Sequence, residues 1–473
     1  MKKNVLLFWL LFCVVIPVIC TNAQGTCLGG NTVVLDNIDH SIAFQDIIYK
    51  TAPGIDEIDL PNMVNLGLRV YYPTDLATNE SRPLVVLIHG GFFIGGSYGD
   101  FAPLAQELAQ IGFVAATIDY RLCQRNDCLL AGATSYPCNT SWGYSLLPSA
   151  YVAMIDAADA IRYLQNHAAE FHINSNKVIV GGHSAGALTT LHLAYLDADE
   201  LAPLCGGCGT WPDYMAEPIV PLTGIKAIMP MSGAIYDPNW IDANESNISV
   251  ALIHGTNDGV VPYDYDEMVE CCPNVPFPYM YGACPIAERL SDIGANYELI
   301  TGLDCSHDIF SGGFFNNIKE EVAAFLIKTV VCGGSSIERH LIYTPPGPEN
   351  ICPPFPLYSA DAANTCGLPL DTPYDLTVGV SPAAPESLGW KVHPTLITHN
   401  TLYISQTFQP DNSADVYAIQ ISDITGRVVY HQQSQNSSAN IAIATDQWAQ
   451  GIYFVQIIDS KNRVHSVQKV IKP

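Results

Sequence analysis

A serine flanked by small residues stands at the centre of the sequence Gly-His-Ser-Ala-Gly, residues 182–186. The apolar run Val178-Ile179-Val180 precedes it, and a segment with helical spacing follows. Where a G-x-S-x-G sequence joins a strand to a helix, the sharp, strained turn lifts the serine hydroxyl above the sheet. We therefore expect Ser184 to be a nucleophile; the alternative is a glycine-rich turn with an idle serine.

Two later segments offer the acid and base that such a nucleophile needs. His307 lies between an expected strand and the closing helix and is the candidate general base. Asp258 lies in the polar loop 254–262, after another strand, and is the candidate acid that orients the histidine. Asp304 and Asp308 are rivals, but they flank His307 in sequence, whereas Asp258 comes from a separate strand end. A plain turn aspartate is the alternative reading of Asp258.

A glycine pair offers backbone donors for a developing oxyanion. Gly90 and Gly91 follow His89 at the end of an earlier strand, and glycine lets the backbone come close to a substrate. The N–H of Ala185, directly after the serine, is the expected second donor. We therefore assign Gly90, Gly91 and Ala185 to the oxyanion hole. This chemistry calls for no metal and no organic cofactor.

Alternating strand-like and helical segments must position these residues. The strand-like runs span residues 84–89, 113–119, 178–180, 225–229, 250–253 and 297–300, and the helical ones span 101–110, 152–164, 185–196 and 318–331. Such alternation predicts a parallel sheet wrapped by helices, an α/β fold. The candidate residues all follow strand ends, where open α/β sheets bind their ligands.

The composition and the pattern of apolar residues change after residue 331 and again after residue 390. Residues 332–390 are rich in proline and predict a linker, partly stapled by Cys352 and Cys366. Residues 391–473 contain short strand-like runs separated by turn residues, which predict a small β-sandwich. With a first domain over residues 24–331, the mature chain has two folded units.

The beginning of the chain predicts export. Residues 1–23 combine a positive start, an apolar run of 15 residues from Val5 to Ile19, and small residues at a cleavage point, as in a secretory signal peptide. Two of the 15 cysteines fall in this segment, and the other 13 form close sets that favour local disulfides in an oxidising compartment. Cys205 and Cys208 fit a structural disulfide better than a metal or redox pair. We expect a secreted or cell-surface protein that is not transmembrane.

Composition excludes two classes of partner. Of the 473 residues, 48% are hydrophobic and 14% charged, so the chain can bury a sizeable core. The formal net charge of −26 is the opposite of what nucleic-acid binding requires. It also argues against an anionic membrane surface.

Residues 65–331 resemble the secreted carboxylesterase branch of the α/β-hydrolase superfamily. The resemblance is carried by residues 69–73, 89–91, 118–121, 178–186 and 254–262 and by His307. It implies an α/β-hydrolase fold and a serine esterase that hydrolyses carboxylic esters, with Ser184 as nucleophile, His307 as base and Asp258 as acid. Phe92 and Ala187 depart from the pattern, since many relatives have glycine at both positions.

The C-terminal region resembles the sorting domain of type IX secretion cargo, on residues 392–394, 421–427, 450–454 and 469–472. It implies the secretion machinery as a partner; a carbohydrate-binding or adhesive sandwich is the alternative.

The segments expected to select the substrate are three inserts of the first domain. Three inserts, at residues 121–150, 197–223 and 262–285, follow strand ends and carry aromatic residues, so we expect them to rim the site and favour small-molecule or polymer-linked esters with apolar or aromatic groups. The same aromatics could instead pack beneath the loops. Two other functions remain as alternatives: a serine exopeptidase of the same fold, and a catalytically silent surface-binding protein.

Overall fold

The computed structural model of the chain describes residues 21–22, 25–27, 32–35, 40–54, 63–77, 80–122, 142–196, 200, 222–269, 277–309, 314–344, 357–358, 366–373, 375–378, 390–393, 401–406, 417–423, 427–434, 441–449, 451–459 and 464–472. The expected signal peptide, apart from Thr21 and Asn22, lies outside them.

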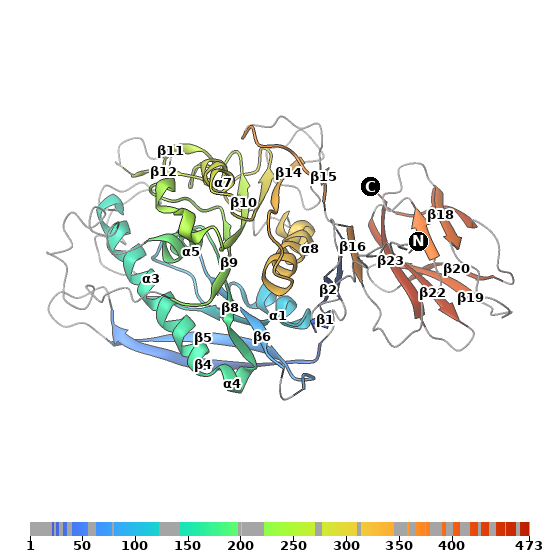
Figure 1. The fold of residues 1–473 in the computed structure, drawn as a ribbon, viewed down its shortest axis with the longest axis horizontal. Helices are drawn as coiled ribbons and strands as arrows, with labels where there is room; N and C mark the ends of the chain where they lie inside the picture. The colour runs from blue at the N-terminus through green and yellow to red at the C-terminus, as the bar shows by residue number, and fades with distance from the viewer. Residues whose placement is uncertain are drawn as a thin grey trace, which may run out of the picture.

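A ten-stranded sheet forms the centre of the larger unit (Figure 1). Its order is β15-β14-β13-β10-β9-β8-β6-β7-β5-β4. In chain order the strands are β4 (Ile42–Pro53), β5 (Met63–Pro73), β6 (Arg82–Ile88), β7 (Val114–Ile118), β8 (Ile173–His183), β9 (Ile225–Met231), β10 (Ser249–Gly255), β13 (Tyr297–Gly302), β14 (Glu338–Thr344) and β15 (Leu357–Tyr358). The seven strands β14, β13, β10, β9, β8, β6 and β7, which are neighbours in this order, run parallel. Strands β4, β5 and β15 pair antiparallel at the two edges. This is the mostly parallel sheet of the α/β-hydrolase fold.

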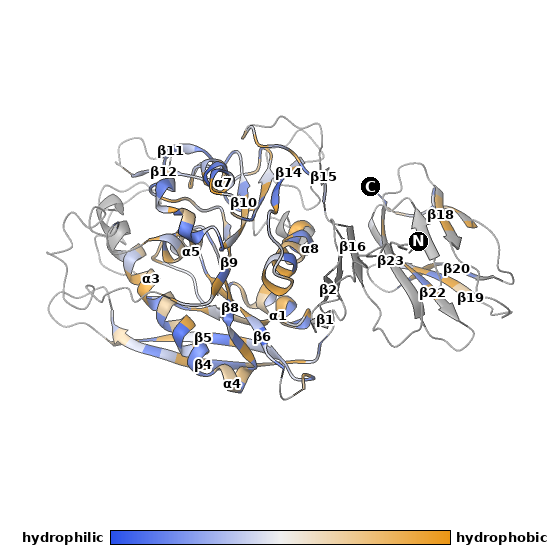
Figure 2. Cartoon of the chain, viewed as in Figure 1, coloured by the Kyte–Doolittle hydropathy of each residue, from blue (hydrophilic) through white to orange (hydrophobic). Residues whose placement is uncertain are grey.

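Helices cover both faces of the sheet. Helices α3 (Trp142–Asn166), α5 (Ala185–Tyr195) and α7 (Ala283–Asp292) contribute to one core, and α1 (Ala102–Gln110) and α8 (Phe314–Leu326) contribute to the other. Strand β6 shows why: Leu84, Val86 and Ile88 enter the first core, whereas Val85 and Leu87 enter the second. Because successive side chains of a strand point to opposite faces, a strand covered on both sides must be apolar throughout. Figure 2 shows orange, apolar residues along these strands and helices.

The expected strands and helices of this unit are confirmed, with α8 continued by a π-helical turn over Ile327–Val331. Shorter elements complete it: α4 (Ala168–Phe171), the 3₁₀ turns Pro238–Trp240 and Ala243–Glu245, and the hairpin of β11 (Tyr265–Glu267) and β12 (Tyr279–Tyr281). A separate small sheet has the order β1-β2-β3-β16, formed by β1 (Thr21–Asn22), β2 (Gly25–Cys27), β3 (Thr32–Leu35) and β16 (Asp375–Val378).

The sheet continues beyond the expected boundary at residue 331, which corrects the prediction that 332–390 is only a linker. Strand β14 pairs in parallel with β13. Its Arg339 is 3% exposed and donates to the buried carboxylates of Glu298 (3.0 Å) and Glu321 (2.6 Å). Removing one partner from such a buried cluster leaves an uncompensated charge, which costs about 3–5 kcal/mol. The prolines that follow β14 directly, Pro345 and Pro346, make this stretch look like a linker in the sequence.

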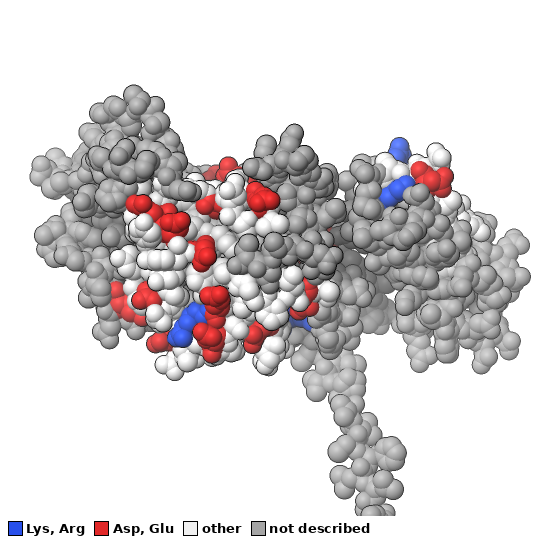
Figure 3. Space-filling model, turned by 90° about the horizontal axis from the view of Figure 1, so that it is seen from above, with Lys and Arg blue, Asp and Glu red and all other residues white. Residues whose placement is uncertain are grey.

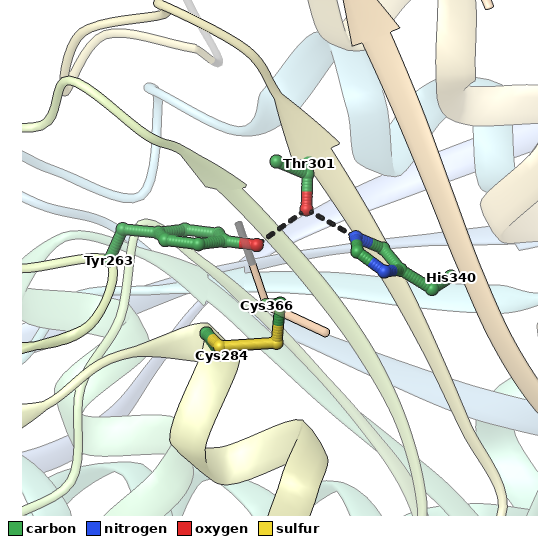
Figure 4. Close-up of a disulfide and its surroundings, with 5 residues drawn as sticks. All are labelled: Tyr263, Cys284, Thr301, His340 and Cys366. Carbon is green, nitrogen blue, oxygen red and sulfur yellow. Dashed lines mark hydrogen bonds between the residues drawn. A yellow bond between two sulfur atoms is a disulfide. The ribbon is translucent and has the colours of Figure 1, made fainter. Parts of the chain in front are cut away.

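One disulfide also crosses the expected boundary. Cys284, in α7, is bonded to Cys366, 82 residues away, and Figure 4 shows the bond beside a buried chain of Tyr263, Thr301 and His340. The expected local staple of Cys366 to Cys352 is therefore wrong. The backbone N–H of Asp371 donates to the carbonyl of His340 (2.9 Å), so the segment after Cys366 also contacts β14. Cys305 and Cys332 are disulfide-bonded as well. Beyond the expected signal peptide, eight other cysteines lie outside the described residues: Cys123, Cys128, Cys138, Cys205, Cys208, Cys271, Cys272 and Cys352.

The C-terminal unit is the expected β-sandwich, and Figure 1 shows it at one end of the molecule. One antiparallel sheet has the order β17-β18-β21, with β17 (Trp390–His393), β18 (Thr401–Gln406) and β21 (Ile441–Ala444). The other has the order β20-β19-β22-β23, with β19 (Tyr417–Asp423), β20 (Val428–Ser434), β22 (Gly451–Asp459) and β23 (Val464–Lys472). Alternate residues such as Ile419 and Ile421 are buried between the sheets.

Candidate active site

Ser184 lies on the turn between β8 and α5 with a strained backbone. Its φ of 56° and ψ of −120° are uncommon for a residue with a side chain. The flanking glycines make the turn possible: a Cβ on Gly186 would collide with the carbonyl oxygen of Ile88, and a Cβ on Gly182 would collide with that of Gly186. The sequence folds here into the sharp strand-to-helix turn that its motif predicts.

His307 joins the other two predicted residues. Its Nε2 lies 2.8 Å from Ser184 Oγ, and its Nδ1 lies 2.8 Å from Asp258 Oδ2. The carboxylate accepts a hydrogen bond from Nδ1–H, which leaves the Nε2 lone pair free to accept the serine proton. Asp258 is fully buried and His307 is 16% exposed at its side chain, so the histidine is open to solvent and the acid is not. Asp304 and Asp308, the rival acids, are exposed.

The Asp258 carboxylate receives four hydrogen bonds. Oδ1 accepts from the backbone N–H groups of Val260 and Val261, both at 2.9 Å. Oδ2 accepts from His307 and from Nε2 of His254, the latter at 3.1 Å. Burial by itself raises the pKa of this carboxyl, but the bonds from the two histidines outweigh burial and hold the pKa well below its usual range. The group therefore stays ionised at neutral pH.

The predicted oxyanion residues lie around Ser184. A Cβ on Gly90 would stand 3.2 Å from the Cβ of Ser184, so the glycine loop touches the nucleophile. The carbonyl of Gly90 accepts from His89 Nδ1 (2.7 Å) and from the hydroxyl of Tyr120 (3.3 Å). The N–H of Gly91 belongs to the same peptide unit as this carbonyl. In a planar trans peptide it points in the direction opposite to the Gly90 carbonyl oxygen.

The other expected donor sits at a helix start. Ala185 is the first residue of α5, where N–H groups have no acceptor within the helix and carry the positive end of its dipole. The loop has Phe92 where many relatives have glycine, and it accommodates this residue at a φ of 57°. The sequence missed the contribution of Tyr120, whose ring stacks on His89 with centroids 4.2 Å apart.

Two further residues hold the backbone of His307. Its carbonyl oxygen accepts from His183 Nε2 (3.2 Å) and from the hydroxyl of Ser232 (3.1 Å). Ser232 follows β9, is fully buried and has a φ of 51°. Nothing in its local sequence marks Ser232, because its role depends on the approach of a distant loop.

The titration of His183 gives a stability prediction. Burial, and then the charge of His307, lower its pKa to about 4. An unfolded histidine has a pKa of about 6.5, so between these values the unfolded chain binds a proton that the folded chain does not. Its contribution to stability is therefore complete above about pH 6.5 and declines toward pH 4, by about 3 kcal/mol over this window. We expect His183→Gln, which keeps an N–H donor but does not titrate, to flatten the fall of Tm across this range. Equal slopes of Tm against pH in the two proteins would contradict the prediction.

The predicted aromatic rim is described in part. Tyr263 and Phe277 are packed in the core, as the alternative reading required. Tyr265 and Tyr279 are each 52% exposed. Tyr281 stacks on Tyr265 with centroids 4.3 Å apart and pairs with the loop after β9 through Ile235. The β11–β12 hairpin thus presents aromatic faces near the strand ends that carry Ser232 and Asp258. The predicted inserts also carry Tyr136, Trp211, Tyr214 and Met215, which lie outside the described part, and Trp142 and Tyr144, which belong to α3.

Possible metal ligands come together at one place among the described residues. One group of three possible ligands occurs there, Cys284, Glu288 and Cys366, but its two sulfurs form the disulfide and so offer no thiolate. No helix of the described part has both the length and the apolar character needed to span a bilayer. Acidic side chains are scattered over the described part of the face seen in Figure 3.

Two known families match segments of the chain. Residues 144–233, which include Ser184, match the BD-FAE family, a family of α/β-hydrolase esterases. Residues 398–473 match the secretion system C-terminal sorting domain. The second match supports export to the cell surface or the exterior.

Individual proteins are similar in sequence to this chain over short stretches. Carboxylesterase 1C of Rattus norvegicus is 31% identical over 124 residues, 26% of this chain and 20% of the relative. The non-reducing polyketide synthase pkbA of Emericella nidulans is 38% identical over 90 residues, 19% of this chain and 3% of the relative. The chain therefore spans only a small part of the length of these relatives.

Among solved structures, Thermogutta terrifontis esterase 2 phosphorylated by paraoxon aligns with a TM-score of 0.40 and 19% identity, over 60% of this chain and 94% of that chain. The sheet, the helices on both its faces and the two family matches lead to one conclusion. The chain joins a domain of α/β-hydrolase fold, with a segment that matches an esterase family, to a C-terminal domain that matches the secretion sorting domain.

Proposed function

We propose that the protein is a secreted serine esterase that hydrolyses carboxylic esters through an acyl-enzyme. The observation that supports this most directly is the position of His307, 2.8 Å from Ser184 on one side and 2.8 Å from Asp258 on the other. This is the geometry that a serine nucleophile, its general base and an orienting acid require. The family match over the serine turn adds independent support.

In the proposed mechanism, Ser184 Oγ attacks the ester carbonyl carbon while its proton moves to His307 Nε2. The carbonyl oxygen becomes an oxyanion that accepts hydrogen bonds from the backbone N–H groups of the Gly90–Gly91 loop and of Ala185. As the tetrahedral intermediate collapses, the ester C–O bond breaks and His307 protonates the departing alkoxide.

The second half of the reaction repeats these steps with water. His307 takes a proton from the water molecule as its oxygen attacks the acyl carbon, and a second oxyanion forms in the same place. The Ser184 ester bond then breaks, the serine recovers its proton and the carboxylic acid leaves. Asp258 holds the histidine ring in the required tautomer and stabilises its positive charge throughout.

The substrate we propose is an ester with an apolar or aromatic group. The exposed rings of Tyr265 and Tyr279 beside the strand ends support this, because aromatic faces bind apolar and aromatic surfaces. The test is a panel of nitrophenyl and hydroxycinnamoyl esters beside aminoacyl amides. Faster hydrolysis of the aromatic esters supports the proposal, equal rates across the esters remove the aromatic preference, and faster cleavage of the amides points to an exopeptidase. A purified protein that neither hydrolyses the panel nor reacts with a fluorophosphonate probe is a silent binding protein.

The C-terminal unit should serve export rather than catalysis. Ser184, Asp258 and His307 all precede residue 310, and a chain ending at Val378 keeps β14, the Cys284–Cys366 disulfide and β16. We expect this truncated enzyme, without its signal peptide, to hydrolyse soluble esters with kcat/KM within about twofold of the full chain, since domains joined by a linker share few contacts.

Deleting residues 391–473 in the producing cells should instead leave the protein inside the envelope, as measured by cell fractionation. Normal surface delivery of the shortened chain would discard the sorting role. Loss of its activity on soluble esters would mean that the two units share a site.

A further inference from the structure

A second histidine contacts the buried acid. His254 lies near the end of β10 and is fully buried. Its Nε2 is 3.1 Å from Asp258 Oδ2 and 3.1 Å from the carbonyl oxygen of Val261. Both neighbours are acceptors, so Nε2 carries the ring proton and donates to both. His254 takes no part in the proton transfers of the proposed reaction.

The position of His254 differs in kind from that of the other donors to Asp258. The N–H groups on Oδ1 belong to Val260 and Val261, in the same loop as Asp258, and they move with it. His254 belongs to a strand paired on both sides, with β9 and with β13. It therefore ties the acid and the backbone of its loop to an interior strand of the central sheet.

The ring of His254 has one hydrogen-bonding orientation. Its Nδ1 is buried and has no hydrogen-bond partner among the described residues. A flipped ring would remove a hydrogen bond from Asp258 Oδ2, which would keep only that from His307, and would remove one from the Val261 carbonyl; losing buried hydrogen bonds is costly. The ring of Tyr263 packs edge-on against it, with centroids 5.7 Å apart. The donor is thus held in place by packing as well as by hydrogen bonds.

We propose that His254 is a positioning residue for the reaction: its Nε2–H fixes Asp258 so that Oδ2 faces His307 Nδ1. The inference rests on the proposed esterase function and adds a residue to it. Because His254 touches neither substrate nor nucleophile, its loss should slow the chemical step while leaving substrate binding intact. A shift of about 1 Å in a catalytic group can cost about 10²-fold in rate.

The test compares three changes at this position. His254→Leu removes the donor, His254→Asn keeps an amide that is too short to reach both acceptors, and His254→Gln places an amide N–H close to the original Nε2. We expect kcat to fall by about 10- to 100-fold in the first two, with KM within about twofold, and to recover to within about fivefold of wild type in His254→Gln. Rates are divided by the number of sites that react with a fluorophosphonate probe, so that misfolded protein does not count.

The matched control is His340→Leu. His340 is equally buried, lies in the same sheet and also uses its Nε2, on Thr301 Oγ1 at 2.9 Å, but it does not contact the acid. We expect its Tm to fall and its kcat per reactive site to stay unchanged.

Three outcomes would overturn the inference: wild-type kcat per reactive site in His254→Leu or His254→Asn, equal loss in His254→Gln, or equal loss in His340→Leu. Should the leucine variant fail to fold, the pair His254→Asn and His254→Gln decides alone. A wild-type protein that neither labels nor hydrolyses esters would instead reject the esterase function itself.

Discussion

Ser184→Ala is expected to lower kcat for ester hydrolysis by about 10⁶-fold while leaving the fold intact. The nucleophile, base and acid act as a unit, so losing the serine hydroxyl removes nearly all of the chemistry that depends on them. His307 would keep its bond to Asp258 but would have no proton to accept. Alanine lacks only the hydroxyl and meets the same backbone strain at a φ of 56°, so we expect the Tm to stay within about 2 °C.

A matched serine separates the role of the hydroxyl from the effect of the substitution. Ser249 is buried and is the first residue of β10, at the end of the strand away from Asp258. The side-chain amide of Asn296 donates to its hydroxyl (3.2 Å). Ser249→Ala should keep full activity and full reaction with a fluorophosphonate probe, whereas Ser184→Ala should lose both. Residual activity above about 1% in purified Ser184→Ala, with no wild-type enzyme present, would remove Ser184 as nucleophile.

Much of the site could be predicted because its signals are local. The turn at Ser184 is encoded by the apolar run before it, the glycines around it and the helix after it, all within about ten residues. The sequence favours Asp258 over Asp304 as the acid because Asp258 follows a separate strand, and parallel strands bring their carboxyl ends to one edge of the sheet. In the structure Asp258 is the carboxylate bonded to His307, and its catalytic role stays a prediction.

The rest could not be predicted because it depends on contacts between distant segments. Arg339 joins Glu298 and Glu321 across three elements, and its strand is followed directly by the prolines of a segment that reads as a linker. Cys366 finds Cys284 rather than its sequence neighbour because pairing follows proximity in the folded chain. Tyr120 and His254 belong to ordinary strand ends in the sequence, and only their partners in space reveal what they hold.

Asp258→Asn is expected to lower kcat by about 10⁴-fold, the second largest effect. The N–H groups of Val260 and Val261 require an acceptor, so the asparagine oxygen should take the place of Oδ1 and its NH₂ group the place of Oδ2. That NH₂ group then donates to His307 Nδ1, which forces the ring proton onto Nε2. Because Nε2 can no longer accept the serine proton, the base is lost although the bonds from Val260 and Val261 are kept. His254 Nε2–H also loses its acceptor at Oδ2 and keeps the Val261 carbonyl.

The rival acids provide the controls for this change. Asp304 and Asp308 are exposed and flank His307 in sequence, so Asp304→Asn and Asp308→Asn should keep kcat within about threefold of wild type. The tautomer argument makes a further demand, because a base with its proton on the wrong nitrogen should not recover by substrate saturation. The loss in Asp258→Asn should therefore appear in kcat and in kcat/KM alike, with KM nearly unchanged. If Asp304→Asn is instead the crippling change, the acid comes from the loop of His307 itself, and the buried carboxylate at Asp258 serves only to hold the loop after β10 in place.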